Sequence, residues 1–251
     1  MSVPPKGPTP EAHLDRLERA IEAFAATLAT GTLEAPVPAC TPWDLRALTW
    51  HMGNIHRWAR DAMRVGRGAE DAEGGPAERA PLTSWFREGA DALVRSLRSS
   101  DPAAECWTFG PKPRTFAFWF RRQAHETAMH AWDAARSQGA QGNFELPFAL
   151  DGIDEVVGMF FPRQVRLQRI GPLSRSLALE PSDAPQTRWV LATDGAGPES
   201  TPLASAPATI RGPANALLLL LWARLPLEEA KVVVDGSLEV AREVLSAALT
   251  P

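Results

Sequence analysis

The tetrapeptide Gly139-Ala140-Gln141-Gly142 separates two stretches of different sequence pattern, and it decides the fold that we predict. Before it, apolar residues recur every three or four positions, which is the period of an amphipathic helix. After it, short β-like runs come between helical segments, which is typical of a small layered domain. The sequence therefore predicts one domain over residues 10–141, a second over residues 146–251, and an α+β fold class.

Four segments before this boundary carry the helical period, and loops join them. The second segment has the clearest start signal, because Thr41 is a candidate N-cap, Pro42 occupies the N1 position and Asp44 at N3 complements the helix dipole. Four helices of such lengths favour a helical bundle. We expect them over residues 11–30, 41–65, 83–98 and 115–138.

The part of the chain after the boundary alternates between helical and β-like segments, which favours a small α/β domain. Its first helical segment is either one helix or a broken pair, since Pro162 interrupts it. Helices are expected over residues 147–168, 213–226 and 237–248. Strands are expected over residues 176–180, 188–192, 208–211 and 231–234.

Composition and charge argue against several classes of protein. The chain has 251 residues and a formal net charge of −4, which argues against a nucleic-acid partner because such partners attract a basic face. The longest apolar run, 216–223, is far shorter than the roughly 20 residues that span a bilayer. The first eight residues lack the apolar core of a signal peptide. With only Cys40 and Cys106 no disulfide framework is possible, and we expect a cytoplasmic protein.

The densest group of polar side chains lies in the fourth expected helix. His125 and His130 are five residues apart there and diverge by roughly 140°, so they cannot readily bind one ion together. Glu126 and His130 are four apart and lie within roughly 40° of each other, so this pair can chelate a metal ion. A third ligand could come from His51 or His56 on the second helix, and periodicity does not choose between them. The same spacing is also that of an ordinary helix-stabilising ion pair.

Four residues are candidates to support such ligands, because ligating groups need partners that fix their orientation. Arg122 and Asp133 fall on the same helical face as Glu126. His56 follows His51 by five residues, and His125 directly precedes Glu126.

Three stretches of the sequence carry a resemblance to known proteins. They are Cys40-Thr-Pro-Trp-Asp-Leu-Arg-Ala-Leu-Thr-Trp-His51-Met-Gly, then Phe118-Trp-Phe-Arg-Arg-Gln-Ala-His-Glu126-Thr-Ala-Met-His130-Ala-Trp-Asp133, and then residues 210–226 with Arg224 near their end. Together they resemble the mycothiol-dependent maleylpyruvate isomerase family. The resemblance implies a DinB-like, metal-binding four-helix bundle followed by a sterol-carrier-like α/β domain.

The resemblance also implies a set of site residues and cofactors. His51, Glu126 and His130 would bind zinc, although another divalent first-row metal would suit the same ligands. Mycothiol, or a similar low-molecular-weight thiol, would be the thiol cosubstrate. Arg224 would handle the substrate, and the alternative is that it only caps the end of a helix.

The expected activity is attack of this thiol, as a thiolate, on an electrophilic small molecule. Its outcome would be either S-transfer or a cis–trans isomerisation of the maleylpyruvate type. The alternative is a DinB-like protein that binds a metal or a small molecule without turnover. No nucleic-acid or membrane partner is expected, and the protein would be a monomer or a homodimer.

Overall fold

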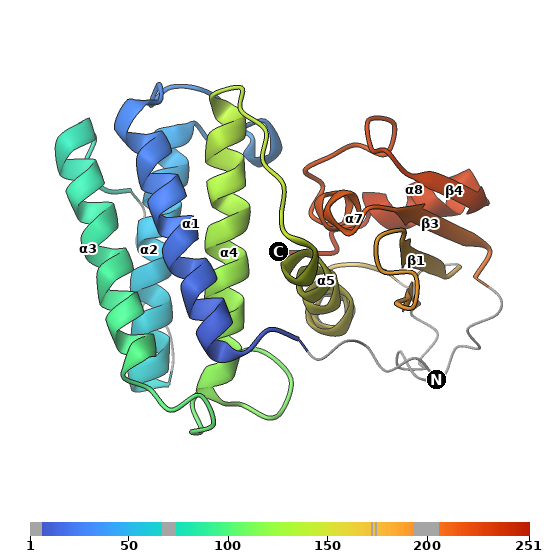
Figure 1. The fold of residues 1–251 in the computed structure, drawn as a ribbon, viewed down its shortest axis with the longest axis horizontal. Helices are drawn as coiled ribbons and strands as arrows, with labels where there is room; N and C mark the ends of the chain where they lie inside the picture. Colours follow the sequence, from blue (N-terminus) through green and yellow to red (C-terminus); the bar gives the residue numbers. More distant parts are fainter. Residues whose placement is uncertain (1–6, 67–73, 172, 174, 193–205) are drawn as a thin grey trace. The chain divides into compact units, whose positions relative to one another are not determined.

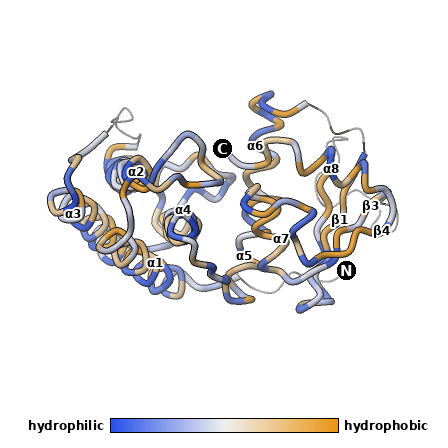
Figure 2. The backbone as a smooth tube through the Cα atoms, turned by 90° about the horizontal axis from the view of Figure 1, so that it is seen from above, coloured by the Kyte–Doolittle hydropathy of each residue, from blue (hydrophilic) through white to orange (hydrophobic). Residues whose placement is uncertain are grey.

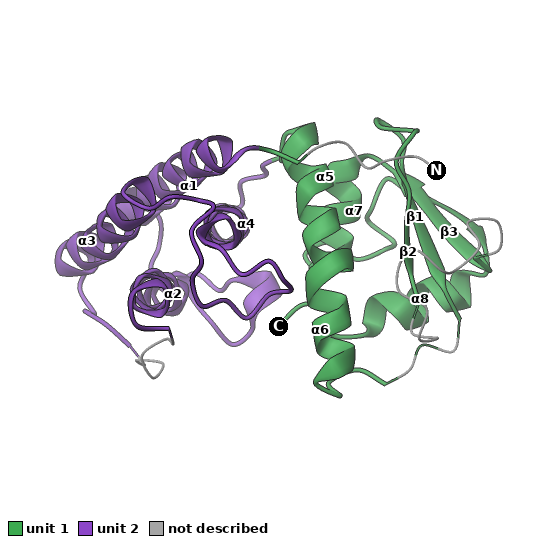
Figure 3. Cartoon of the chain, turned by 90° about the horizontal axis from the view of Figure 1, so that it is seen from below, with its two compact units in different colours: residues 1–8, 143–251 green, residues 9–142 purple. Residues whose placement is uncertain are grey.

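The structure is a computed structural model, and it describes residues 7–66, 74–171, 173, 175–192 and 206–251. It divides into two compact units, one of residues 9–142 and the other of residues 143–251 together with Gly7 and Pro8 (Figure 3). Helices dominate the first unit, and a sheet with helices makes up the second, so the predicted α+β fold class is confirmed. Within the described ranges, no helix combines the length and the apolar character needed to cross a membrane.

Four long helices run through the described part of the first unit. They are α1 (Pro10–Thr30), α2 (Leu45–Val65), α3 (Arg79–Arg98) and α4 (Phe116–Ser137) (Figure 1). Along α1 and α3 the colours of Figure 2 alternate between hydrophilic and hydrophobic, as expected of helices with one buried face. In the core of this bundle, the rings of Phe24 and Phe86 stack with centroids 4.8 Å apart. Helix α3 begins four residues before its predicted start, because Pro81 fits the first turn of a helix, where its missing N–H needs no partner.

The start of α2 also differs from the prediction. Thr41 is not the N-cap: that position belongs to Asp44, whose side chain accepts a 2.8 Å hydrogen bond from the Ala47 N–H. An Asp caps a helix at least as well as a Thr. The chain before it forms the short helical turn η1 (Pro38–Cys40), and the Trp43 N–H donates to the Cys40 carbonyl. Pro42 therefore lies in a turn between η1 and α2, and not in the first turn of α2.

The second unit contains a mixed sheet whose described strands follow the order β2-β1-β3-β4. Strands β1 and β3 are parallel, and the pairs β1–β2 and β3–β4 are antiparallel. Each strand lies within two residues of its predicted range. The strands are β1 (Leu177–Pro181), β2 (Trp189–Leu191), β3 (Ala208–Gly212) and β4 (Val233–Gly236).

Helices pack beside this sheet and complete the unit. They are α5 (Leu146–Glu155), the π-helical η2 (Val156–Phe160), α6 (Phe161–Arg166), α7 (Ala214–Leu221) and α8 (Leu238–Ser246). The first predicted helix of this unit thus consists of three adjoining helical segments, with a π-helical one in the middle and Pro162 in the first turn of α6.

The helix predicted over residues 213–226 is shorter in the structure and does not reach Arg224, because α7 ends at Leu221. Ala223 adopts a left-handed conformation with φ of 53°, and the Arg224 N–H donates back to the Leu219 carbonyl over 2.8 Å. This is the bonding of a helix that closes on a left-handed residue. Arg224 therefore follows the helix end instead of lying within the helix.

Candidate metal centre

Helices α2 and α4 bring three metal-ligating side chains together inside the first unit. The Glu126 Oε1 atom lies 3.4 Å from His51 Nε2 and 3.4 Å from His130 Nε2. One donor atom from each residue lies within 4.8 Å of those of the other two. Two imidazole nitrogens and a carboxylate oxygen are donors that zinc and other first-row metals accept. All three side chains could therefore contact one ion.

The other histidine of α2 is not part of this group. The His56 side chain is buried, and its Nε2 atom lies 3.0 Å from the hydroxyl of Thr127. Burial lowers the pKa of His56 to about 3, so the imidazole stays neutral. His125 likewise lies outside the group, and its ring makes an edge contact with that of His13 at 5.9 Å. Of the two histidines on α2 that periodicity left open, only His51 stands beside Glu126 and His130.

The second carboxylate oxygen of Glu126 is held from the same helix. Arg122 Nη2 donates to Glu126 Oε2 over 2.9 Å, and the Arg122 side chain is only 2% exposed. Burial favours the protonated acid, but hydrogen bonds with His130 and His51 and the charge of Arg122 outweigh it. The pKa of Glu126 therefore lies well below its ordinary value, and the group is an ionised carboxylate.

His130 has a carboxylate partner on the ring nitrogen that faces away from Glu126. Its Nδ1 atom lies 3.0 Å from Asp133 Oδ2, and the Asp133 side chain is fully buried. When Nδ1 carries a proton that it donates to Asp133, Nε2 presents its lone pair towards Glu126. Burial alone would lower the pKa of His130, but hydrogen bonds with Asp133, Cys40 and Glu126 raise it well above its ordinary value. Metal binding at this ring would thus compete with a proton.

Two residues beside the group were given no role by the sequence analysis. The Trp43 ring packs against the His51 ring with centroids 4.7 Å apart, and Cys40 Sγ lies 3.5 Å from Asp133 Oδ2. Both residues precede α2 in the structure, Cys40 just before the predicted helix start and Trp43 just after it. The only signal was their place in the first resembling stretch, and that stretch does not say what they contact.

Arg224 belongs to the second unit, where it contacts Trp222. Its Nη1 atom donates to the Trp222 carbonyl over 2.8 Å, and its guanidinium carbon lies 5.6 Å from the centroid of the Trp222 ring. These contacts are those expected of a residue that caps the end of α7.

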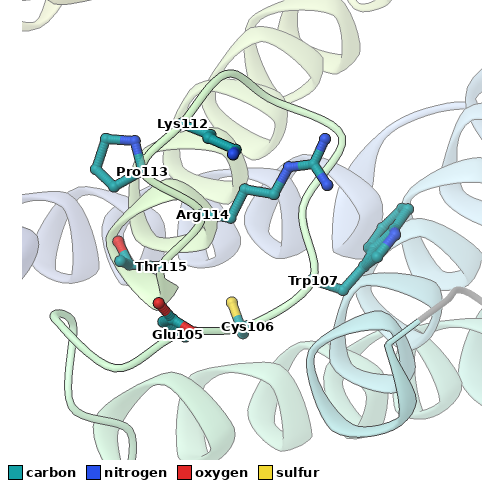
Figure 4. A pocket seen from close by; sticks show the side chains of 7 residues that line it. All are labelled: Glu105, Cys106, Trp107, Lys112, Pro113, Arg114 and Thr115. Atoms are coloured by element: carbon teal, nitrogen blue, oxygen red, sulfur yellow. The ribbon is translucent and has the colours of Figure 1, made fainter.

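The segment before α4 lines a separate, open hollow of about 870 Å³ (Figure 4). Lys112 and Arg114 supply positive charge, and Cys106 supplies a thiol. Burial raises the pKa of the Cys106 thiol, which disfavours its thiolate form and any role as a nucleophile. Eleven residues of helix, about 16 Å, separate Thr115 at its edge from Glu126. The remaining lining residues are Glu105, Trp107 and Pro113.

Two family models match the chain. One, described as the mycothiol maleylpyruvate isomerase N-terminal domain, covers residues 14–135, and the MDMPI C-terminal domain covers residues 147–243. Among solved structures, the fold is similar to that of a mycothiol-dependent maleylpyruvate isomerase (TM-score 0.59) and of a histidine-to-alanine mutant of such an enzyme (TM-score 0.60). Each alignment has 12% identity and covers 89% of this chain and 92% of the other chain. No curated protein matches significantly.

Proposed function

Since the chain belongs to the mycothiol-dependent maleylpyruvate isomerase family, we propose that it is a metal-dependent enzyme that uses mycothiol on an electrophilic small molecule. The observation that supports this proposal best is the group formed by His51, Glu126 and His130, with donor atoms within 4.8 Å of one another. The outcome of the reaction is either a cis–trans isomerisation of the maleylpyruvate type or the transfer of the thiol to the substrate.

These three residues would hold Zn²⁺ or another divalent first-row metal ion. The bound ion would supply a Lewis acid that favours the thiolate form of a coordinated thiol. Two neighbouring side chains orient these ligands. Arg122 fixes one oxygen of Glu126 and leaves the other directed at both histidines. Asp133 fixes the tautomer of His130.

We expect the thiol and the substrate to approach the three residues from the side of His51, because His51 is the more exposed histidine. The His51 side chain is 27% exposed, whereas that of His130 is 8% exposed. The ring of Trp43 covers part of His51 and limits its rotation. An open position beside three protein ligands is the usual arrangement of catalytic zinc.

For the substrate side, we propose that Arg224 holds a carboxylate or a developing enolate oxygen of the substrate. Its local hydrogen bond to Trp222 favours the simpler role of a helix-end cap, so a test must separate the two. An Arg224→Lys variant keeps the charge and loses the planar fork. We expect a large fall in turnover with unchanged metal content and melting temperature. Unchanged activity, or stability that falls together with activity, would assign Arg224 to capping.

The decisive experiment is elemental analysis of the purified protein followed by calorimetric titration with mycothiol. We expect about one zinc ion per chain, lost in His130→Ala and kept in the control Cys106→Ala. Mycothiol should bind only to the metal-loaded protein, which should then convert maleylpyruvate or another electrophile. A folded wild-type protein without metal would overturn the proposal. Binding of ligands without turnover and without need for metal would favour a non-catalytic DinB-like protein.

A further inference from the structure

We propose that Cys40 is a positioning residue of the metal centre, which orients His130 through Asp133 and through its own contact with the imidazole. The Cys40 Sγ atom lies 3.5 Å from Asp133 Oδ2, and the same oxygen lies 3.0 Å from His130 Nδ1. The thiol and the imidazole N–H thus both donate to one carboxylate oxygen. This inference rests on the proposed function, because positioning His130 matters only if its other nitrogen binds a metal.

The burial of Asp133 makes these hydrogen bonds necessary. Its side chain has no exposed surface, and a buried carboxylate is costly unless hydrogen bonds compensate for the lost water. His130 lies three residues before Asp133 on the same helix, so the bond between them does not tie either side chain to another element. Cys40 comes from a different element, the turn η1, and ties the carboxylate to a second point in the bundle.

The turn that carries Cys40 is itself well anchored. The Val37 N–H donates to the Trp43 carbonyl over 2.9 Å, and the Trp43 N–H donates to the Cys40 carbonyl over 2.8 Å. The ring of Trp43 in turn packs on the ring of His51. The segment 37–43 therefore contacts one histidine ligand directly and orients the other through Asp133, so it couples the geometry of both.

A rival role for Cys40 is that of a metal ligand. Donor atoms of Cys40, His130 and Asp133 also lie within 4.8 Å of one another. A metal ion there would need the Nδ1 nitrogen of His130, which lies at hydrogen-bond distance from Asp133, while Nε2 faces Glu126. In the positioning role, Nδ1 of His130 bonds to Asp133 and Nε2 is left for the ion beside Glu126, so no second ion is needed. The two roles differ in whether sulfur ever bonds to the metal.

The test compares Cys40→Ala and Cys40→Ser with the control Cys106→Ala, whose thiol lines the separate hollow. Zn²⁺ affinity is measured by competition with a chromophoric chelator, and the melting temperature is measured on the metal-free proteins. We expect Cys40→Ala to bind Zn²⁺ about 10-fold more weakly, the low end of the effect of outer partners of a metal site. The Ser hydroxyl can donate to Asp133, so Cys40→Ser should bind more tightly than Cys40→Ala. Cys106→Ala should equal wild type.

Wild-type affinity in Cys40→Ala would overturn the proposal. So would equal weakening in Cys40→Ala and Cys40→Ser with a matching fall in the melting temperature of the metal-free proteins, because packing would then explain both. A Co²⁺ titration separates the ligand role: a sulfur-to-cobalt charge-transfer band that disappears in Cys40→Ala would make Cys40 a ligand and also overturn it. A wild-type protein that binds no Zn²⁺ at all would overturn the proposed function together with this inference, whereas the other results leave the proposed function intact.

Discussion

Two histidines five residues apart on α2 face consecutive residues of α4 and lie in opposite environments. His51 Nε2 stands 3.4 Å from the carboxylate of Glu126, with 27% of its side chain exposed. His56 Nε2 stands 3.0 Å from the hydroxyl of Thr127, and the His56 side chain is buried. Consecutive residues project from a helix roughly 100° apart. One step along α4 therefore separates a candidate metal ligand from an internal hydrogen bond.

The difference between the two histidines comes from their partners. Glu126 is charged and also contacts His130 and Arg122, so His51 is part of a group that can hold an ion. Thr127 brings only a neutral hydroxyl to His56, and burial keeps that imidazole uncharged. A histidine on the inner face of α2 can thus be a candidate metal ligand or a buried hydrogen-bond partner. The residue that it faces on α4 decides which.

The largest expected effect is the loss of Zn²⁺ affinity when Glu126, the partner of His51 on α4, is changed. A Glu126→Gln variant keeps the size of the side chain but loses the charge that both histidines and Arg122 face. We expect its Zn²⁺ affinity and its activity to fall by more than the roughly 10–100-fold typical of outer partners. Thr127→Val, one residue away, should keep both. Chelator competition and circular dichroism, as a check of folding, measure the effect, and equal affinities in the two variants would contradict the comparison.

The sequence predicted those parts of the site that depend on a single helix. The pairing of Glu126 with His130 follows from their spacing on α4, because helix geometry fixes which side chains share a face. The choice between His51 and His56 depends on how α2 is rotated against α4. Periodicity does not carry that information, and only the family resemblance indicated His51.

The fold was predicted in the same manner, with errors at the ends of elements. The helical and strand patterns located the described helices and strands, because burial repeats along them. The end of α7 was misplaced, since a left-handed Ala223 closes the helix and an alanine gives no such signal. The positions of Cys40 and Trp43 beside Asp133 and His51 were not predictable, because only long-range packing brings the segment before α2 to these side chains.

A smaller effect is expected from the hydrogen bond of His56. Thr127→Val keeps the shape of the buried side chain and removes its hydroxyl, which leaves a buried imidazole nitrogen without that partner. We expect the free energy of unfolding of the metal-free protein to fall by about 1–3 kcal/mol. Thr27→Val is the control, because the Thr27 hydroxyl donates to the Ala23 carbonyl of its own helix and its loss should cost little. Urea unfolding measures both, and a control that loses as much stability would disprove the role of the His56 bond.

The smallest expected effect is the dependence of stability on pH that His56 creates. Its pKa is about 3 in the folded protein against 6.5 for an ordinary histidine, so below pH 6.5 the unfolded chain binds a proton that the folded chain refuses. The free energy of unfolding should therefore fall as the pH falls from 6.5 towards 3, by at most about 1.4 kcal/mol per pH unit from this residue. Well above pH 6.5 both states are neutral at His56 and its contribution is constant, whereas at pH 6.5 the unfolded histidine is already half protonated.

Urea unfolding of metal-free wild type and His56→Gln at pH 7.5, 6.5 and 5.5 isolates this slope, because the other titrating groups are common to both proteins. We expect wild type to lose more stability than the variant, with most of this excess loss between the two lower pH values. Equal losses across the whole range would mean that His56 accepts a proton in the folded state, and the contrast between the two histidines of α2 would then rest on geometry alone.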